Sequence, residues 1–440
     1  MTFNEVALSE YCVVEGGYAY KSGDFKDKGT HKVIKIKNVR VGSLEYSDTS
    51  FIDADLANKT QKWVTKTGDV LISMTGSGPN SPASVVGRVA RVSKNDPSSF
   101  INQRIGRIFL KKQKAISLDF IFYLLSLPKS QNYLVSNSSG SANQANISGQ
   151  IIGSLPCPAI SFTESLAIAS IGRCLDEKIE NNRRMNETLE KMARAIFKSW
   201  FVDFDPVHAK ATGNAPAHMD AETAALFPSS FDDDGLPVGW SHRTIEECGD
   251  VITGKTPSTK RTEYFGNEYP FIKIPNMSSV WVTATETSLS QAGHQTQAKK
   301  LLPKGAVLVS CIASPGEVSI VSKPSHTNQQ VNAVVPTEEC PTSWLYCALV
   351  NLRTEIIGMA SGGSVTPNLN KGDFSQIKVI RSSNLLMVSF DKIVRPLFDK
   401  ILSNDEENQT LAELRDTLLP KLMSGEIHVK DAERAVEAAV

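Results

Sequence analysis

Apolar side chains recur in a heptad pattern from residue 163 to about residue 204, which predicts one long helix. No glycine or proline interrupts residues 173–205, so this helix can run without a break. A second heptad segment in the same register lies near the C-terminus. The apolar positions of the two segments are Ile168, Ile171, Leu175, Met185, Leu189, Met192 and Ile196, and then Phe390, Ile393, Leu397, Leu411, Leu414 and Leu418. A helix of about 40 residues would span about 60 Å.

Both heptad segments carry polar residues at equivalent seam positions. Lys178 and Lys400 fall at d positions, and Asn182 and Asn404 fall at a positions. A buried asparagine at an a position fixes the register of a helix pair at some cost in stability. We therefore expect the two helices to pair as an antiparallel coiled coil. The alternative is that each helix packs only on its own domain.

The chain also repeats itself over most of its length. A shift of 222 residues aligns residues 140–189 with residues 362–411 without a gap. A shift of 238 residues aligns residues 33–38 with residues 271–276. So long a period indicates a duplication and not a solenoid. A duplicated unit suits a partner with two-fold symmetry of its own, and duplex DNA is a common example.

Each copy begins with a mixed domain of short strands, loops and a helix. The strand candidates of the first copy are Val33–Ile36, Val70–Ser73, Val85–Val92 and Ile105–Leu110. The helix candidates are Leu118–Val135, which contains Pro128, and Trp344–Met359 in the second copy. Gly16 falls opposite Gly254 at the 238-residue shift. Because no regular βαβ alternation is visible, the expected fold class is mixed α/β (α+β) with mostly antiparallel strands.

These patterns divide the chain into six expected segments. They are a first mixed domain (1–158), a central helix (159–205), a linker (206–236), a second mixed domain (237–382), a distal helix (383–425) and a C-terminal tail (426–440).

The composition is ordinary for a globular protein of 440 residues. No apolar run approaches the roughly 20 residues of a membrane helix, and no signal peptide is evident. The seven cysteines are scattered, odd in number and without a C-x-x-C pair. This usage favours a reducing cytoplasm, without a disulfide framework or a zinc site.

The formal net charge is zero, but the charge is unevenly distributed. Residues 1–155 carry +7 (19 Lys and Arg against 12 Asp and Glu), and residues 237–381 carry +2 (13 against 11). Residues 156–236 carry −5 (8 against 13), and residues 382–440 carry −4 (7 against 11). One interpretation is local noise in a solvated surface. The other is a molecule that offers its basic domains to a polyanion and its acidic helices to another partner.

One segment matches the P-loop pattern G-x-x-x-x-G-K-[ST], at Gly249–Thr256. A P-loop needs a buried strand before it and a helix after it, so that backbone N–H groups point at phosphate. The residues before this match, Glu246–Cys248, are not an apolar strand, and Pro257–Arg261 after it is typical of a loop. We therefore do not expect a nucleotide site here.

No other catalytic pattern is present in the sequence. The seven histidines form no H-x-x-x-H or H-E-x-x-H pair, and there is no G-x-S-x-G elbow. Nor does the chain contain the Asp/Asn-Pro-Pro-aromatic sequence of an amino-group DNA methyltransferase. We expect no catalytic residue, no metal site and no cofactor.

Asn-Gln dipeptides recur at a similar place in both copies, at Asn102–Arg104 and Asn328–Gln330. Asn, Gln and Arg suit bidentate contacts to purine edges in the major groove. The alternative is a turn before a strand, in which Asn satisfies backbone groups. The loop Thr75–Ser81 is longer than its counterpart Ala313–Gly316, and loops that differ on a shared scaffold are where two sequences would be read.

Several motifs together resemble the DNA specificity (S) subunit of type I restriction–modification systems. The opening of the second domain, the central region, the linker and the distal region carry the resemblance, at Gly254–Pro257, Glu263–Gly266, Pro270–Lys273, Phe197–Val207, Ala221–Pro228, Leu236–Trp240 and Thr417–Ile427. The first domain departs from the pattern, because Gly16–Ala19 is not followed by Thr-Pro.

The resemblance implies two target recognition domains, each reading one half of a split double-stranded DNA target. The helix pair would act as a ruler for the unread spacer and would bind two methyltransferase (M) subunits. Restriction (R) subunits would join through the M subunits, and methyl transfer and ATP-driven cleavage would belong to these partners. The chain itself would be a non-catalytic cytoplasmic protein without a membrane partner.

Candidate site residues follow from the polar loops and from the helix seams. The candidates for DNA contact are Lys35, Lys37, Asn38, Ser77, Asn80, Gln103, Arg104, Asn143, Gln144, Lys273, Asn276, Ser314, Gln329, Gln330, Thr366 and Asn368. The candidates for the subunit interface are Leu175, Asn182, Leu189, Trp200, Phe201, Leu397, Asn404, Leu411 and Leu422. Two other functions stay open: a protein-interaction scaffold on a coiled-coil stalk, and a P-loop NTPase that uses Lys255.

Overall fold

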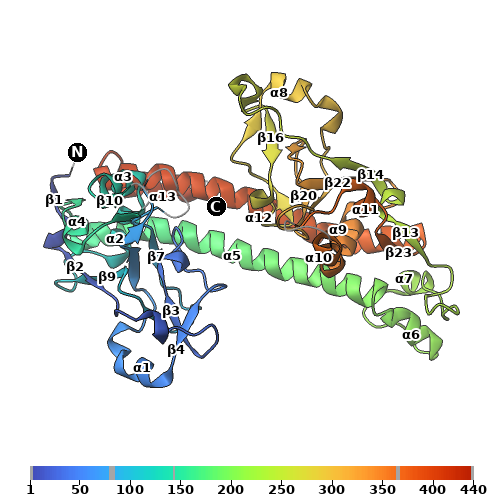
Figure 1. Ribbon diagram of the computed structural model, residues 1–440, viewed down its shortest axis with the longest axis horizontal. Helices are drawn as coiled ribbons and strands as arrows, with labels where there is room; N and C mark the ends of the chain where they lie inside the picture. Colours follow the sequence, from blue (N-terminus) through green and yellow to red (C-terminus); the bar gives the residue numbers. More distant parts are fainter. Residues whose placement is uncertain (1–2, 79–84, 142–143, 363–366, 438–440) are drawn as a thin grey trace. The chain divides into compact units, whose positions relative to one another are not determined.

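The computed structural model describes residues 3–78, 85–141, 144–362 and 367–437. The chain folds as two compact units, of which unit 1 is Met1–Lys178 with Thr410–Val440 and unit 2 is Ile179–Gln409. Each unit contains one mixed domain and part of both long helices, which are green and red in Figure 1. The chain therefore leaves unit 1 in the middle of one helix and returns to it in the middle of the other.

Unit 1 is built on a four-stranded antiparallel sheet with the order β2-β9-β5-β7. These strands are β2 (Cys12–Gly16), β9 (Ile105–Leu110), β5 (Val70–Ser73) and β7 (Val89–Arg91). The smaller sheets contain β4 (Ser50–Ile52), β3 (His31–Ile34) and β8 (Ser99–Ile101), then β10 (Ser139–Ser141), β11 (Gln144–Asn146) and β6 (Thr75–Gly76), then β1 (Glu5–Ala7) and β12 (Pro156–Pro158). All four residues of β5 are buried, because this apolar strand has a neighbour on each side.

The helix predicted over residues 118–135 is two helices, because Pro128 begins the second of them. Proline has no backbone N–H to continue a helix, but it fits the first turn of a new one. The helices of unit 1 are α1 (Ala54–Lys59), α2 (Leu118–Ser126), α3 (Pro128–Ser136), α4 (Gly149–Gly153) and α13 (Val429–Glu437).

Unit 2 repeats this topology. Its main sheet, β14-β22-β19-β20-β17, contains β14 (Gly249–Thr253), β22 (Val331–Pro336), β19 (Val307–Ser310), β20 (Val318–Val321) and β17 (Trp281–Val282). The other sheets contain β15 (Phe265–Gly266), β18 (Ser288–Leu289), β16 (Tyr269–Ile272) and β21 (His326–Thr327), then β13 (Ser241–Thr244) and β23 (Lys378–Arg381). Its short helices are α6 (Asp205–Ala211), α7 (Ala221–Ala225), α8 (Gln291–Gln295), α9 (Thr342–Asn351), α10 (Arg353–Ser361) and α11 (Lys371–Ser375).

The repeat in the topology confirms the mixed fold class with two similar domains. The order β14-β22-β19-β20 repeats β2-β9-β5-β7, and β18-β16-β21 repeats β4-β3-β8. In the second of these sheets one strand pair is parallel in both copies. Strand β3 pairs with β8, where Ile34 lies opposite Ile101, and β16 pairs with β21, where Ile272 lies opposite Thr327. Most other strand pairs are antiparallel, as predicted, and β17·β20 is a further parallel pair.

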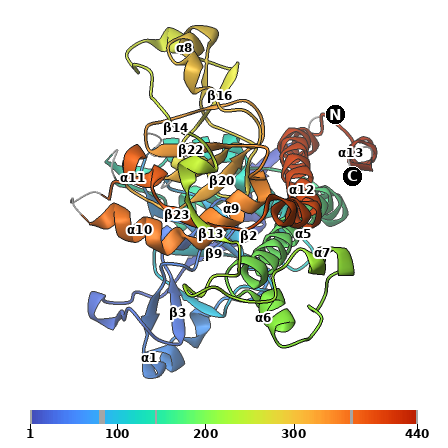
Figure 2. The same cartoon turned by 90° about the vertical axis from the view of Figure 1, so that its right-hand side faces the viewer.

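Two long helices, α5 (Phe162–Phe201) and α12 (Asn384–Ser424), lie side by side in each unit (Figures 1 and 2). In unit 2 the Asn182 Nδ2 donates to Glu407 (2.8 Å) and the Asn186 Nδ2 donates to Asp405 (2.8 Å). In unit 1 the Arg415 guanidinium donates to Asp176 (2.7 Å). Because the numbering rises along α5 as it falls along α12, the pair is antiparallel, as predicted, and the helices do not pack only on their own domains.

The predicted heptad fails in the second half of α5 and at Ile393 of α12. Met185 and Met192 are 44% and 49% exposed, and Ile393 is 40% exposed. The buried positions in the second half of α5 are Asn182, which the heptad predicted, and Asn186, Ala193, Phe197, Trp200 and Phe201, which it did not place on the seam. A straight α-helix drifts about 20° per heptad from an exact seven-residue repeat, so the buried face moves off the predicted seam.

The segment expected as a linker packs onto unit 2. The Trp200 ring lies 5.2 Å from the Phe227 ring, and the Phe204 ring lies 6.2 Å from the Phe231 ring. Phe227 is buried, and the short helices α6 and α7 lie within this segment. The segment is rich in alanine and aspartate, but its few large apolar side chains, such as Phe227, are buried and attach it to the core of unit 2.

Candidate nucleic-acid interface

Four loop segments of unit 2 meet at one end of the strands of its main sheet. The Lys255 N–H donates to the Thr327 carbonyl (3.0 Å), and the Cys311 N–H donates to the Gln330 carbonyl (2.8 Å). The Cys311 carbonyl accepts from the Leu369 N–H (2.9 Å). These bonds join residues 254–256, 311–314, 327–330 and 367–369, which we call loop cluster 2.

The same bonds recur in unit 1. The Tyr18 N–H donates to the Ile101 carbonyl (2.9 Å), and the Met74 N–H donates to the Arg104 carbonyl (2.8 Å). The Met74 carbonyl accepts from the Ile147 N–H (2.9 Å). These bonds join residues 17–18, 74–77, 101–104 and 144–147, which we call loop cluster 1. The two units therefore offer one backbone arrangement with two sets of side chains.

Glycine is required where the first loop of each cluster passes close to a neighbouring backbone. A β-carbon at Gly254 would lie 2.1 Å from the Asn328 carbonyl oxygen, and one at Gly17 would lie 2.2 Å from the Ile101 carbonyl oxygen. Gly17 is thus the counterpart of Gly254, and the alignment of Gly16 with Gly254 is wrong by one residue. Adjacent glycines hide such a shift in the sequence.

Eight of the thirteen predicted DNA-contact residues that the structure describes come together in the two loop clusters. The exposed ones are Gln103, Arg104 and Gln144 in cluster 1 and Ser314, Gln329 and Asn368 in cluster 2. Ser77 and Gln330 belong to the clusters and are half-buried. Asn80, Asn143 and Thr366 lie outside the described residues. The contacts with DNA remain predictions. The positions of these residues in two clusters are consistent with such contacts.

The Asn-Gln dipeptides form turns and also expose side chains. Asn102 Oδ1 accepts from the Arg104 N–H (3.2 Å), and Asn328 Oδ1 accepts from the Gln330 N–H (3.1 Å). The asparagine thus satisfies the turn backbone in both copies. The residue after it, Gln103 or Gln329, is exposed. The turn interpretation holds for the asparagines and leaves the glutamines available to a ligand.

The segments that hold Lys35 and Lys273 lie beside the clusters. The Asn102 N–H donates to the Ile34 carbonyl (3.0 Å), and the Asn328 N–H donates to the Ile272 carbonyl (3.2 Å). Lys35 and Lys273 follow these two carbonyls directly and are half-buried, and Lys37 is exposed.

Asn38 is a turn residue and not a candidate for base contact. It is 1% exposed, its Oδ1 accepts from the Lys35 N–H (2.9 Å), and its Nδ2 donates to the Glu45 and Asp48 carbonyls. An amide that is buried and bonded in this way cannot reach a base edge. Asn276 makes the equivalent bond to the Lys273 N–H (2.8 Å) and is half-buried.

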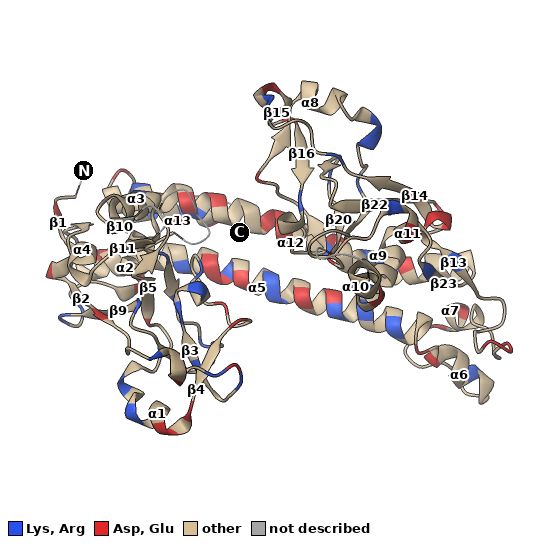
Figure 3. Ribbon diagram, viewed as in Figure 1, with Lys and Arg blue, Asp and Glu red and all other residues tan. Residues whose placement is uncertain are grey.

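Figure 3 shows ribbon segments of Lys and Arg on the loops near α1 and near α8, with segments of Asp and Glu among them. The Lys35 Nζ lies 3.4 Å from the centre of the Phe25 ring. Burial, and then the charge of Lys37, lower the pKa of the Lys35 ammonium. A cation held in this way on an aromatic face loses less side-chain entropy when it meets a phosphate.

Sequence reasoning did not nominate three exposed cations of this region as DNA contacts. Lys255 belongs to loop cluster 2, and Lys260 and Arg261 follow it along the chain. Thr256 Oγ1, next to Lys255, donates to Gln329 Oε1 (2.5 Å), so this loop orients a predicted contact residue. The signal lies in Gly254–Pro257, which carries the family resemblance and overlaps the P-loop pattern.

The P-loop interpretation fails on geometry. Gly249–Thr253 is strand β14 itself, antiparallel to β22, and residues 254–258 form a loop that leads to no helix. A phosphate cradle needs N–H groups at the start of a helix, and here the Lys255 N–H is bonded to Thr327.

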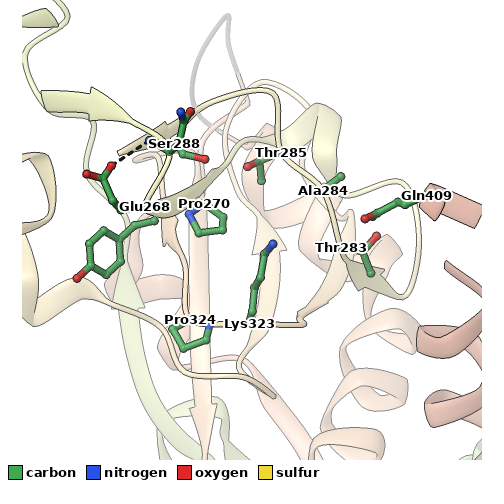
Figure 4. Close-up of a pocket in the computed structure, with 11 residues that line it drawn as sticks. Glu268, Pro270, Thr283, Ala284, Thr285, Ser288, Lys323, Pro324 and Gln409 are labelled. Atoms are coloured by element: carbon green, nitrogen blue, oxygen red, sulfur yellow. Dashed lines mark hydrogen bonds between the residues drawn. The ribbon is translucent and has the colours of Figure 1, made fainter. Parts of the chain in front are cut away.

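One cavity of unit 2 is lined by described side chains that form no catalytic constellation. Figure 4 shows this cavity of about 470 Å³, whose described lining is polar and contains a single carboxylate, Glu268. That carboxylate accepts from the Asn267 N–H (2.9 Å). Across the described part of the chain, no three His, Cys, Asp or Glu side chains are grouped as metal ligands. Nor does any described helix combine the length and the apolar character needed to cross a membrane.

The residues predicted for the subunit interface are instead used inside the chain. Leu175, Asn404, Leu411 and Leu422 are at most 1% exposed, and Asn182 is 4% exposed. Trp200 and Phe201 belong to the core of unit 2, and Leu189 and Leu397 are half-buried against it. A side chain that faces the antiparallel partner helix cannot also face another protein. A partner would therefore meet the opposite faces of the helices.

Comparisons with known proteins agree with this arrangement. The family model described as "Type I restriction modification DNA specificity domain" matches residues 1–191 and 237–380. The chain is 36% identical over 420 residues to the Type I restriction enzyme HindI specificity subunit of Haemophilus influenzae, covering 85% of this chain and 89% of the relative. It is 25% identical over 332 residues to the MjaIX specificity subunit of Methanocaldococcus jannaschii, covering 74% and 72%.

A solved structure has the same fold. The type I restriction–modification S subunit from M. genitalium superposes with a TM-score of 0.54 at 19% identity, covering 96% of both chains. The duplicated topology, the family match and the identity to curated relatives lead to one conclusion. The chain belongs to the family of type I restriction–modification DNA specificity (S) subunits.

Proposed function

We propose that the chain is the non-catalytic subunit that reads a bipartite DNA target, with one half-site for each loop cluster. The supporting observation is the set of backbone bonds repeated between the clusters, with Tyr18, Met74 and Ile147 matching Lys255, Cys311 and Leu369. Two like backbones with unlike side chains suit two half-sites of different sequence. The 1–158 and 237–382 segments would be the two target recognition domains.

The side chains of the clusters suit base reading more than catalysis. Arg104 is exposed in cluster 1 where cluster 2 has Gln330. Arginine pairs with the O6 and N7 atoms of guanine, and glutamine with the N6 and N7 atoms of adenine. The exposed lysines around each cluster would contact phosphates, which position a protein without specifying sequence.

The partners in this proposal are double-stranded DNA, two M subunits, and R subunits held through the M subunits. Leu166 on α5 and Val388 on α12 are 47% and 37% exposed, and they correspond at the 222-residue shift. Two equivalent apolar residues on outward faces of the two long helices suit two copies of one partner. S-adenosylmethionine and ATP would bind the partners, and this chain would need no cofactor.

The first test is a methylome. The chain is expressed with the methyltransferase encoded beside it, and N6-methyladenine is mapped by single-molecule sequencing. We expect a split motif that disappears when this gene is removed. Arg104→Ala should relax one base of one half-site by about 1–3 kcal/mol and leave the other half-site unchanged. A motif that is indifferent to the gene would refute the proposal.

Two further assays separate the other functions. A protein-interaction scaffold would show no salt-dependent DNA binding. A P-loop enzyme would hydrolyse ATP as the isolated chain, and Lys255→Ala would abolish that turnover. We expect salt-dependent DNA binding and no turnover that depends on Lys255.

A further inference from the structure

One carboxylate of unit 2 connects three elements. Asp405 lies on α12, and its Oδ2 accepts from Ser279 Oγ (2.7 Å), in the loop that leads to β17. Its Oδ1 accepts from Asn186 Nδ2 on α5 (2.8 Å). The two oxygens thus bond one to the recognition domain and the other to the second helix.

The bonds at Asp405 stand where packing is incomplete. A hollow of about 560 Å³ lies at this junction, lined by both helices and the loop, including Asn186, Ser279, Trp281 and Asp405. Close packing elsewhere positions elements without specific bonds. The domain also packs on both helices through one hydrophobic core, and the hydrogen bonds of Asp405 add directional contacts at the hollow, where that core does not reach.

Other contacts support the same loop from its far side. Trp281 Nε1 donates to the Phe398 carbonyl of α12 (2.9 Å), and Ser319 Oγ donates to the Ser279 carbonyl (2.7 Å). Asn404, which is fully buried beside Asp405, donates from Nδ2 to Asn186 Oδ1 (2.7 Å). The loop before β17 is thus bonded to α12 at two points, through Trp281 and through Ser279.

The first copy has no equivalent of this connection. The counterpart of Ser279 is Val41, which is 80% exposed, and the counterpart of Asp405 is Arg183. Unit 1 is joined to its helices by different residues, because Asp176 accepts from Tyr123 Oη (2.6 Å) and from Arg415 (2.7 Å). A change at Asp405 thus affects one domain only.

We propose that Asp405 is a positioning residue that fixes the second recognition domain on the helix pair and thereby restricts the spacer between the half-sites. This inference rests on the proposed function. One base pair more or less in the spacer moves a half-site by about 3.4 Å and turns it by about 34°. The bonds that Asp405 makes to Ser279 and Asn186 oppose that turn, and their loss should make the domain more tolerant of it.

The test uses the full methyltransferase complex and duplexes that carry the mapped motif with the native spacer or with one base pair added or removed. The complex with Asp405→Ala should methylate the altered spacers at least several-fold more, relative to the native one, than the wild type does. Asp405→Asn keeps the shape and one acceptor, and the Ser279 hydroxyl can rotate to accept from its amide. It should therefore retain most of the discrimination. Ser279→Ala, a milder change at the same bond, should relax the spacer if Asp405→Ala does not fold.

Asp399→Ala is the matched control, since Asp399 is an exposed aspartate on the same helix. It should leave spacer selectivity unchanged. Spacer selectivity equal to wild type in both Asp405→Ala and Ser279→Ala would overturn the inference, even if both variants melt earlier. Failure of the wild-type complex to recognise any split motif would instead refute the proposed function.

Discussion

At the residue scale, two close backbone contacts define the loop clusters. Gly17 and Gly254 each place their α-carbon where a side chain would collide with a carbonyl group of the neighbouring segment. The collision is with backbone, which cannot rotate away as a flexible side chain would. These positions therefore belong to the scaffold that holds the exposed glutamines, and they do not read bases themselves.

Gly254→Ala should destabilise unit 2 by about 2 kcal/mol or more, because a β-carbon 2.1 Å from the Asn328 carbonyl oxygen forces the loops apart. Urea unfolding of the purified chain measures this loss. Gly358→Ala is the control, since Gly358 lies in α10 and a β-carbon added there would meet no atom within 4 Å. This control variant should gain up to about 1 kcal/mol. Equal stability of the two variants would contradict the argument.

His326 should make unit 2 sensitive to acid. Burial, and then the nearby His294, lower its pKa from 6.5 to about 4. His294 Nδ1 lies 3.0 Å from His326 Nε2, and the Tyr269 ring stacks on His294 at 4.3 Å. The folded state thus prefers neutral His326, and this contribution is complete above pH 6.5 and lost as the pH falls through 4.

The loss by pH 5 should be about 2 kcal/mol. Unfolding free energies at pH 7.5 and pH 5 would measure it, and His326→Gln should remove most of the difference. His242→Gln, on an exposed position of β13, should keep the wild-type difference. A pH dependence unchanged by His326→Gln would show that other groups cause it.

At the element scale, the strands were more predictable than the seams. Val70–Ser73 and Ile105–Leu110 are strands with the predicted bounds, because β-branched runs between turn residues have few other ways to be buried. The heptad predicted the right helices but the wrong exposed face at Met185 and Met192. The heptad pattern identifies a helix, but the difference between a seven-residue repeat and the true helical repeat accumulates along the helix and misplaces the buried face.

The candidate site was only partly predictable for a related reason. Sequence can nominate Gln103 or Gln329 by chemistry, but it cannot show that Asn38 turns its amide inward to the Glu45 carbonyl. The sequence does not distinguish an exposed asparagine from a buried one. Lys255, Lys260 and Arg261 were not predicted as DNA contacts, because the P-loop pattern gave another explanation for the motif that contains Lys255.

The length of the helix pair should set the spacer. Deleting one heptad from residues 168–199 of α5, together with the equivalent heptad of α12, shortens each helix by about 10 Å. This corresponds to about 3 base pairs of DNA, so the mapped motif should lose about that many spacer positions and keep both half-sites. An unchanged spacer in a folded double deletion would refute this role of the helices.

At the scale of the whole molecule, the net charge of zero conceals an uneven distribution of charge between the domains and the helices. The mixed domains are basic and the helical segments acidic. A polyanion would therefore be attracted to the domains and repelled from the helices, which leaves the helices to protein partners. Net charge alone would have argued against a nucleic-acid ligand.

DNA affinity of the assembled complex should fall steeply with salt. If about 6–10 phosphates are contacted, binding should weaken about 10³–10⁵-fold between 50 and 200 mM salt. Lys255→Gln should weaken binding to specific and nonspecific DNA alike and reduce the salt slope by about 1. Lys191→Gln, an exposed lysine of α5, serves as the control and should leave the slope unchanged. Fluorescence anisotropy over a salt series measures both.

The division of unit 1 between the two ends of the chain has a consequence for synthesis on the ribosome. Unit 2 is continuous from Ile179 to Gln409, whereas unit 1 needs Thr410–Val440, and the Phe3 N–H donates to the Ser424 carbonyl (3.4 Å). The domain made first is therefore completed only after residues 410–424 of α12 have been translated, while the domain made second can close on its own. Until then Asp176 lacks its ion pair with Arg415. A message truncated after residue 409 would yield a complete unit 2 attached to an unfinished unit 1, a natural substrate for proteases.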